Sequence, residues 1–215
     1  MAYTRTLVIL ANSVKKGRYC VAGKDLETGE WVRPVASAAG DGLPCSRVRV
    51  TNPYGTFRAK PLQVVEMGFQ QPVPLATQPE NHLTDDTAWR QRYKKERERL
   101  HLFVDTPEHL WMYGPETHRF PTAAIGGAKG HQSLYLVAVE TVEFRVKTNY
   151  WGHKRIVAYF TYNGVLYGMS VTDPAYADYL RHDIGYEWQE TRRYLCLSQT
   201  DDFHGHCYKV VAAVL

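Results

Sequence analysis

The stretch that decides the fold of this chain is RTLVILANSVKKGRYCVAGKDLETGEWVRPV, residues 5–35. Its first part, residues 5–11, is an apolar run that predicts a strand buried on both faces. A polar connection then leads into a second run of strand composition at 19–24, and Glu27-Thr28-Gly29-Glu30 is typical of a hairpin turn. Trp31-Val32-Arg33 predicts the returning strand. Three strands in such close succession predict a β-rich fold.

Outside this stretch, further segments have strand composition, at 47–50, 62–69, 133–146, 155–162, 165–172, 194–198 and 208–215. Two of them are joined by Asn163-Gly164, a strong signal for a two-residue hairpin turn. Asp173-Pro174 ends the strand that follows and predicts the cap of a short helix that runs to Leu180. Strands and helices do not alternate, so a parallel α/β sheet is not indicated.

One longer helix is predicted, over residues 84–103. Thr84-Asp85-Asp86 offers capping side chains. Four apolar side chains then fall near one face at helical spacing: Trp89, Tyr93, Leu100 and Phe103. The opposite face is basic and carries Arg90, Lys94 and Arg97. Such a face is either a solvated surface or one that faces nucleic acid.

The order of these elements predicts a mainly β chain with a helical insert, built as two small β-barrels. Residues 1–75 are assigned to the first barrel, 76–130 to the helical insert and linker, and 131–215 to the second barrel. A chain of 215 residues is long enough to give each barrel a core of its own.

Composition narrows the class of protein. The hydrophobic share is 44%, and no apolar run approaches the roughly 20 residues of a membrane helix. The first residues lack the apolar core and cleavage site of a signal peptide. Cys20, Cys45, Cys196 and Cys207 are scattered, which favours reduced thiols over a disulfide framework. We therefore expect a cytoplasmic protein with no membrane partner.

The formal net charge is only +4, but the charges are segregated along the chain. Residues 1–24 contain bases and no acid: Arg5, Lys15, Lys16, Arg18 and Lys24. Residues 145–155 again contain bases and no acid: Arg145, Lys147, Lys154 and Arg155. A surface of uneven charge is therefore predicted, and basic surfaces attract nucleic acid.

A barrel that binds nucleic acid needs aromatic rings on which bases stack and cations that follow the phosphates. Both basic segments contain such rings. The candidate binding residues near the first segment are Asn12, Lys15, Lys16, Arg18, Lys24, Trp31 and Arg33. Those in the second are Tyr150, Trp151, His153, Lys154 and Arg155. In the alternative interpretation, Trp31 packs across its hairpin and Tyr150-Trp151 cover a sheet edge.

Signals for catalysis are weak. Cys196, His204, His206 and Cys207 are residue types that bind zinc, but their spacing is not that of a recognised finger, and no metal site is assigned. The glycine-rich segment 125–130 is followed by a strand, whereas a phosphate-binding loop leads into a helix. No catalytic residue and no cofactor are predicted, and an enzyme is the less favoured class.

Short motifs at both ends of the chain resemble the bacterial dual OB-containing domain family. They are the opening segments at 8–13, 20–23 and 31–35, the internal Val171-Thr172-Asp173-Pro174, and the closing segments at 194–198, 203–205 and 208–214. The resemblance implies two oligonucleotide-binding-type (OB) barrels and nucleic-acid or nucleotide binding, with a bacterial defence system as the setting. The chain departs from the family at Gln199-Thr200-Asp201-Asp202, where acids replace a more glycine-bearing turn.

The leading hypothesis is a module that binds single-stranded DNA, single-stranded RNA or a nucleotide. One alternative is an adaptor that uses the helix at 89–103 and exposed aromatic side chains to dock a protein partner. Another is a metal-assisted enzyme built on the four Cys and His residues of the closing segment.

Overall fold

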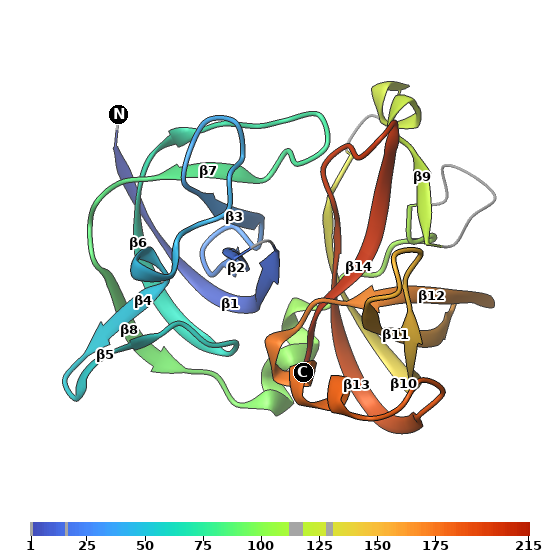
Figure 1. Ribbon diagram of the computed structural model, residues 1–215. Coiled ribbons are helices and arrows are strands. Elements are labelled where there is room, and N and C mark those ends of the chain that lie inside the picture. The colour runs from blue at the N-terminus through green and yellow to red at the C-terminus, as the bar shows by residue number, and fades with distance from the viewer. Residues whose placement is uncertain (1, 16, 112–117, 128–130) are drawn as a thin grey trace. The chain divides into compact units, whose positions relative to one another are not determined.

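The computed structural model describes residues 2–15, 17–111, 118–127 and 131–215. The chain divides into two compact units, Met1–Phe103 and Val104–Leu215, and strands dominate both (Figure 1). Each unit has a hydrophobic core of its own. The predicted mainly β fold is therefore confirmed. Among the described residues, no helix is long and apolar enough to cross a membrane.

The described part of the first unit is built mostly from strands of four to ten residues, with β1 the longest at 13. They are β1 (Tyr3–Lys15), β2 (Arg18–Asp25), β3 (Trp31–Val35), β4 (Arg49–Asn52), β5 (Gly55–Arg58), β6 (Gln63–Pro72), β7 (Asn81–Thr84) and β8 (Trp89–Lys94). The helical turns are the 3-10 helices η1 (Cys45–Arg47) and η2 (Arg97–Phe103).

Five of these strands close a barrel in the order β1-β2-β3-β7-β6, with β6 pairing back onto β1. All the pairs are antiparallel except β3 with β7. The predicted opening strand is central to this barrel, because residues 7–10 are completely buried. The predicted hairpin turn is also confirmed: Gly29 adopts a φ of 74°, and its N–H donates to the Asp25 carbonyl at 2.9 Å.

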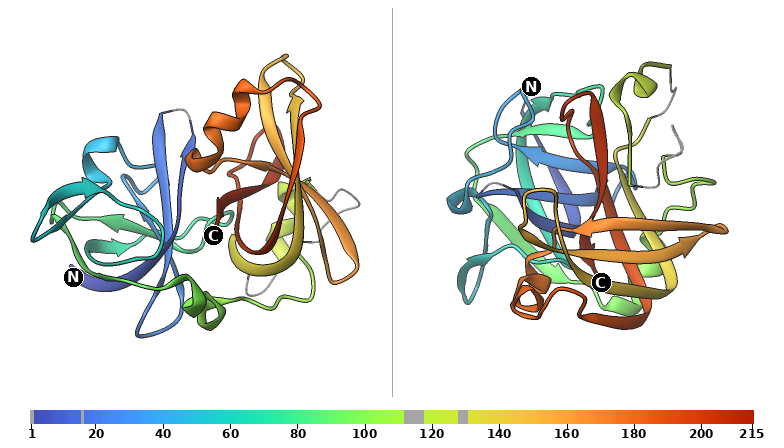
Figure 2. Two further views of the ribbon diagram at one scale, coloured as in Figure 1. Left: turned by 90° about the horizontal axis from the view of Figure 1, so that it is seen from below. Right: turned by 45° about the vertical axis from the view of Figure 1, so that its right-hand side comes forward.

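Three strands extend the sheet beyond the barrel. β8 pairs with β6, β4 runs parallel to β8, and β5 lies at the free edge. β4 and β5 form a hairpin that projects from the unit (Figure 1; Figure 2, cyan). Every residue of β5 is exposed.

The helix predicted for residues 84–103 is wrong. Trp89–Lys94 is strand β8, and only Arg97–Phe103 is helical, as a 3-10 helix. The competing partner is the edge of β6, which offers a ladder of backbone hydrogen bonds that a helix would leave unused. Trp89 is buried while its neighbour Arg90 is exposed, as alternation along a strand requires. The adaptor hypothesis loses the helix that it invoked and keeps only the exposed aromatic side chains.

The described part of the second unit begins with a strand of three residues and continues with strands of 7 to 15 residues. They are β9 (Arg119–Pro121), β10 (Leu134–Thr148), β11 (Lys154–Tyr162), β12 (Val165–Val171), β13 (Glu187–Gln199) and β14 (His206–Val214). The 3-10 helices are η3 (Thr122–Gly127) and η4 (Pro174–Arg181).

The second barrel repeats the topology of the first. Its strands close in the order β10-β11-β12-β14-β13, and β13 pairs back onto β10. Again a single junction is parallel, between β12 and β14. Counted within each barrel, the third and fifth strands are the parallel pair, and η4 lies between the third and fourth strands of the second barrel.

Two local predictions in this unit are confirmed. Asn163 and Gly164 join β11 to β12 with φ values of 46° and 79°, which suits a type I′ turn. Asp173 caps η4, since its carboxylate accepts from the Ala175 N–H at 2.9 Å. The other carboxylate oxygen accepts from the Val214 N–H at 2.9 Å and so ties the helix to the last strand.

Candidate nucleic-acid interface

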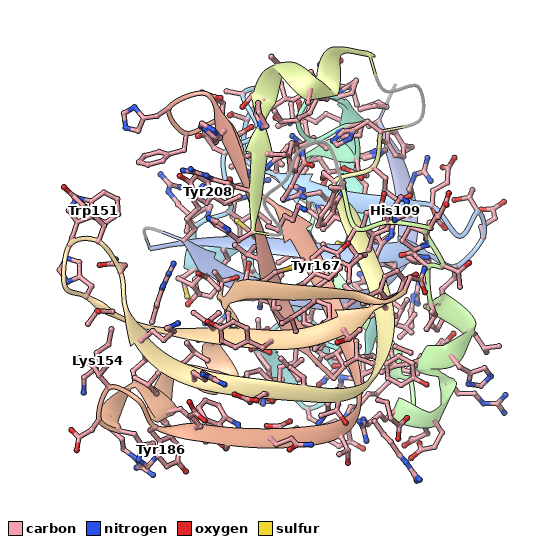
Figure 3. All side chains as sticks on the ribbon, turned by 90° about the vertical axis from the view of Figure 1, so that its right-hand side faces the viewer. His109, Trp151, Lys154, Tyr167, Tyr186 and Tyr208 are labelled. Atoms are coloured by element: carbon pink, nitrogen blue, oxygen red, sulfur yellow. The ribbon has the colours of Figure 1, made fainter. Side chains whose placement is uncertain are left out.

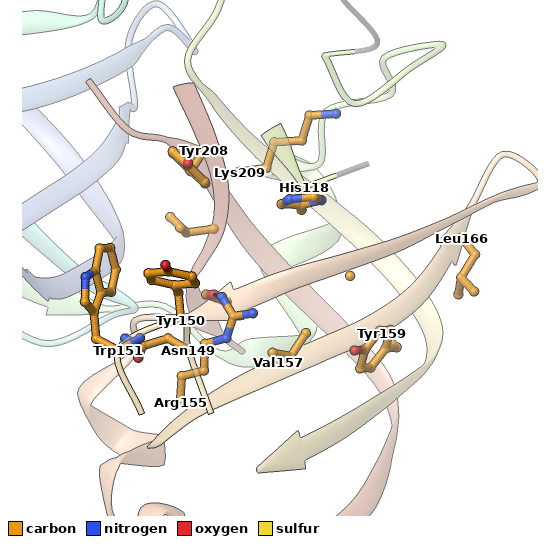
Figure 4. A pocket seen from close by; sticks show the side chains of 13 residues that line it. His118, Asn149, Tyr150, Trp151, Arg155, Val157, Tyr159, Leu166, Tyr208 and Lys209 are labelled. Atoms are coloured by element: carbon orange, nitrogen blue, oxygen red, sulfur yellow. Dashed lines mark hydrogen bonds between the residues drawn. The ribbon is translucent and has the colours of Figure 1, made fainter. Parts of the chain in front are cut away.

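The outer face of the second barrel carries a cavity of about 500 Å³ over β11, β12 and β14 (Figure 4). Alternation along β11 builds it: Ile156, Ala158 and Phe160 point into the core, which leaves Arg155, Val157 and Tyr159 on the outer face. Leu166, Gly168 and Ser170 of β12 and Tyr208 and Val210 of β14 also line the cavity.

The loop between β10 and β11 closes one end of the cavity. The Asn149 side-chain oxygen accepts from the backbone N–H groups of Trp151 at 3.0 Å and His153 at 2.9 Å. This turn holds Tyr150 95% exposed and Trp151 66% exposed. Their rings are 5.9 Å apart and perpendicular, and Trp151 projects from the barrel (Figure 3).

Arg155 begins the floor of the cavity next to this loop. Its guanidinium donates to the Ser170 hydroxyl at 3.2 Å, across the pairing of β11 with β12. The neighbouring Lys154 is exposed, and its ammonium donates to the His182 carbonyl at 2.8 Å. Of the sequence candidates, Tyr150, Trp151 and Arg155 line one cavity, while His153 and Lys154 are exposed beside it.

Tyr159 lies further along the floor, and sequence reasoning missed it. A Cβ on Gly168 would lie 2.9 Å from its ring, so the ring covers the β12 backbone at the glycine. Two cations of β10 hold it: the Lys147 ammonium donates to its hydroxyl at 2.9 Å, and the Arg145 guanidinium carbon lies 5.2 Å from its ring centroid. Its spacing of four residues from Arg155 along one strand was the available signal.

Aromatic side chains also lie at the connection between β13 and β14. Phe203 is 44% exposed, and its ring centroid lies 4.4 Å from that of His204 and 6.3 Å from that of Tyr208. The acidic turn noted in the sequence is here. The Asp202 carboxylate accepts from the Thr122 hydroxyl and from the Gly205 N–H, so part of its charge is engaged within the turn.

The candidates of the first barrel divide into two groups. Lys15 and Arg18 are exposed and lie directly opposite each other on β1 and β2. Lys16 lies outside the described residues. The turn between β1 and β2 is topologically equivalent to the 149–153 loop of the second barrel, because each joins the first strand of its barrel to the second.

The other candidates of this barrel are buried: Asn12, Lys24, Trp31 and Arg33 are each at most 8% exposed. The Asn12 side chain donates to the Ala59 carbonyl at 2.7 Å. The Lys24 ammonium lies 5.4 Å from the centroid of the Trp31 ring. The structure does not bring these four onto one exposed surface with Lys15 and Arg18, and a binding role for them stays a prediction.

The four Cys and His residues of the closing segment do not converge. Cys196 pairs with Ala213 at one end of β14, whereas Cys207 pairs with Phe120 at the other. Burial raises the pKa of the Cys207 thiol, which disfavours the thiolate that a metal binds. Within the described residues, no group of three or more His, Cys, Asp or Glu side chains is arranged to hold a metal ion.

The topology and the cavity can be compared with known proteins. The family model of the dual OB-containing domain matches residues 5–214. This chain belongs to the dual OB-containing domain family. The match covers both barrels of the dual OB chain, and so confirms the resemblance carried by the motifs at its two ends.

No curated protein matches this dual OB chain. Among solved structures, it is similar to the Ifi202 HINa domain, crystallised in complex with 20bp dsDNA. The sequence identity is 12%, the alignment covers 91% of this chain and 88% of that chain, and the TM-score is 0.22. A likeness with so low a TM-score supports no conclusion about the fold or the ligand of this chain.

In OB folds, ligands bind on the second and third strands and on the loops after the first and fourth strands. In the second barrel of this dual OB chain, those strands are β11 and β12, and those loops are 149–153 and 200–205. The cavity lies on both strands and is lined by Asn149, Tyr150 and Trp151 of the first loop. The cavity therefore lies on the surface that the topology selects, although none of its described lining residues belongs to the second loop.

Proposed function

We propose that this dual OB protein binds single-stranded nucleic acid on the outer face of its second barrel. The observation that carries the proposal is the exposed ring pair Tyr150–Trp151 beside Arg155, at the mouth of a cavity of about 500 Å³. An unstacked base offers two faces to such rings, and each stacked base contributes about 1–3 kcal/mol. The turn bonded to the Asn149 side chain holds both rings in solvent, where the one described ring contact is that between them.

The charges on this face support the same ligand. The Arg145 guanidinium is neutralised by Glu143 and Glu187. Within the described residues, Lys147 and Arg155 donate only to hydroxyls, those of Tyr159 and Ser170. Their charge is therefore available to phosphates: Arg155 lines the cavity, and Lys147 is held beside it by its bond to Tyr159, which also lines it.

A single strand fits this surface better than a duplex does. Bases in a duplex are stacked on each other, so their faces are not free to stack on Tyr150, Trp151 or Tyr159. A positive groove with aromatic platforms is the usual arrangement for strands bound without strong sequence preference. A free nucleotide would use only part of the face, and we expect it to bind more weakly.

Fluorescence anisotropy with a labelled mixed-sequence oligonucleotide tests the proposal. Affinity for the single strand should fall steeply as salt rises, because binding releases the ions that surround the phosphates. Trp151→Ala and Tyr150→Ala should each weaken binding about tenfold. Leu102→Ala removes a side chain of similar exposure, 60%, from the first unit and should leave binding unchanged. Absent binding, or binding indifferent to both ring variants, would refute the proposal.

We propose further that the protein acts in a bacterial defence system, which the family resemblance alone supports. Deleting the gene from a bacterial host should then raise the efficiency with which phage form plaques. Restoring the wild-type gene should reverse the effect, and a Trp151→Ala gene should not. Equal plaque numbers with and without the gene, over a broad phage panel, would count against this setting.

A further inference from the structure

The sheet extension of the first unit is strongly basic. Strands β4, β5 and β8 contain no Asp or Glu and carry Arg49, Arg58, Arg90, Arg92 and Lys94. Arg92 is neutralised by Glu66 of β6. Arg49, Arg58 and Arg90 are exposed, and none of them forms an ion pair within the described part of the chain. These three residues define what we call the arginine face.

Strand register brings the three arginines together. Arg49 lies directly opposite Arg58, and Thr51 lies between Thr56 of β5 and Arg90 of β8. Positions two residues apart on a strand share a face, so the three guanidinium groups project from one side of the extension. Like charges opposite each other on paired strands are destabilising. An anion that bridges them would remove that cost.

The present contacts of these arginines do not satisfy their charge. The Arg49 guanidinium donates to the Thr56 carbonyl at 3.0 Å. The Arg58 guanidinium lies 3.8 Å from the Cys45 sulfur and 5.2 Å from the centroid of the Tyr19 ring. All of these partners are neutral. Most of the N–H donors of the Arg49 and Arg58 guanidinium groups therefore remain available to an anion.

A cavity of about 440 Å³ borders the arginine face. Hydroxyl groups line it, from Ser46, Thr51, Thr56 and Thr87, together with the guanidinium groups of Arg47 and Arg49. Two acids also line it. Asp86 pairs with Arg47 at 3.5 Å, and Asp85 accepts from the Thr87 N–H. Asp86 thus pairs with Arg47 and Asp85 bonds the loop backbone, while no described acid forms an ion pair with Arg49.

We propose that the arginine face is a second nucleic-acid contact, which binds the phosphodiester backbone of a strand through Arg49, Arg58 and Arg90. This inference rests on the proposed function, because it assumes that the protein binds nucleic acid. A chain of phosphates fits better than one small anion, since only Arg49 reaches the cavity while Arg58 and Arg90 lie on flanking strands. Contacts with phosphates add affinity, but they do not distinguish one base sequence from another.

Cys45 provides a local reporter of this surface. It is an exposed thiol beside Arg58, whereas Cys20 is half-buried and Cys196 and Cys207 are buried. A nucleic-acid strand bound over Arg58 would cover the Cys45 sulfur. Iodoacetamide should therefore alkylate Cys45 several-fold more slowly when the full-length protein is saturated with a mixed-sequence single-stranded DNA oligonucleotide. Peptide mass spectrometry can follow this one site.

The decisive variant is Arg49→Gln/Arg58→Gln/Arg90→Gln. The oligonucleotide should no longer protect Cys45 of this variant from alkylation. The slope of log affinity against log salt should also become shallower by about 2, because each of three phosphate contacts on a single strand contributes about 0.7. A matched control, Arg99→Gln/Arg181→Gln/Arg192→Gln, removes the same charge from other exposed positions and should keep both the protection and most of the slope. Melting curves verify that both variants fold.

The outcomes separate the two proposals. If the wild-type protein binds the oligonucleotide through Tyr150 and Trp151 while Cys45 reacts at an unchanged rate, the second contact is wrong and the proposed function stands. If the control variant loses as much slope as the arginine variant, the effect is one of net charge and the arginine face is not a site. If the wild-type protein binds no oligonucleotide at all, the proposed function fails first.

Discussion

The ring of Tyr159 lies directly over Gly168, in the space that a side chain on the neighbouring strand would otherwise fill. An added Cβ at position 168 would come within 2.9 Å of Cε1 and 3.2 Å of Cδ1 of the ring. Gly168 does not need its glycine for backbone conformation, since its φ is not in the left-handed region. The glycine is needed so that a ring can lie flat on the floor of the cavity.

Gly168→Ala should therefore displace the Tyr159 ring and weaken oligonucleotide binding about tenfold, within the contribution of one stacked base. The measurement is a double-mutant cycle with Tyr159→Ala. In the Tyr159→Ala background, the alanine at 168 should cost nothing further. Additive losses of affinity would mean that Gly168 acts without Tyr159.

Acid should destabilise the protein through His82. Burial, with the nearby charge of Arg5 as a second cause, lowers the pKa of His82 from 6.5 to about 4. The folded state thus favours the neutral ring, and its contribution is complete above about pH 6.5 and is lost as the pH falls toward 4. Over that window the free energy of unfolding should fall by up to about 3 kcal/mol.

Urea unfolding across this pH range measures the effect. His82→Phe keeps a ring against Phe69, whose centroid lies 5.6 Å away, and removes the proton site. The variant should show a flatter dependence of unfolding free energy on pH. His153→Phe, at an exposed position, is the control and should follow the wild-type curve. Parallel curves for all three proteins would assign the acid sensitivity to other groups.

The buried charge of Lys209 should lower the free energy of unfolding at neutral pH. Its side chain is 2% exposed, and its ammonium packs 5.4 Å from the centroid of the Tyr167 ring and 5.9 Å from that of Phe120. Burial lowers its pKa from 10.5 to about 8. Between these values the unfolded chain binds the extra proton, so the free energy of unfolding rises with pH.

Lys209→Met should therefore raise the free energy of unfolding near pH 7 by about 1–3 kcal/mol, the cost of the buried charge less its attraction to the rings. The gain should shrink toward about pH 10, where the wild-type lysine is largely neutral. Urea unfolding at the two pH values tests both statements. A less stable variant at neutral pH would show that the cation–ring contacts outweigh the cost of burial.

Asp173→Ala should remove two hydrogen bonds at once, those from the N–H groups of Ala175 and Val214. The second donor belongs to the last strand, so the loss reaches beyond the helix cap. We expect the free energy of unfolding to fall by about 2–3 kcal/mol. Asp178→Ala, at an exposed position of the same helix, should cost little and serves as the comparison.

Elements encoded by neighbouring residues could be predicted from the sequence. The apolar run at 7–10 and the Asn163-Gly164 turn need only local chemistry, and both have the predicted structure. Strand β8 could not be predicted in this way. Its charged residues have helical propensity, and the partner that overrides it is β6, which lies far away in the sequence.

The same distinction holds for the candidate site. Tyr150, Trp151 and Arg155 fall within one loop and the strand that follows it, so their proximity was predictable. Tyr208 joins them only because β14 closes the barrel against β12. Trp31 and Arg33 have the same residue types but are buried, and composition alone does not distinguish an exposed ring from a covered one.

The parallel seam between β12 and β14 has a consequence for how a ligand could leave. Its register covers just Ser170 with Val210 and Val171 with Val211, fewer pairs than the neighbouring junctions of that barrel. Ser170 and Val210 both line the cavity. A nucleic-acid strand bound there would contact both β12 and β14 and hold them together. Amide hydrogen exchange along β14 should therefore slow when the nucleic acid binds. Fraying of the final strand and release of the ligand would then be coupled events.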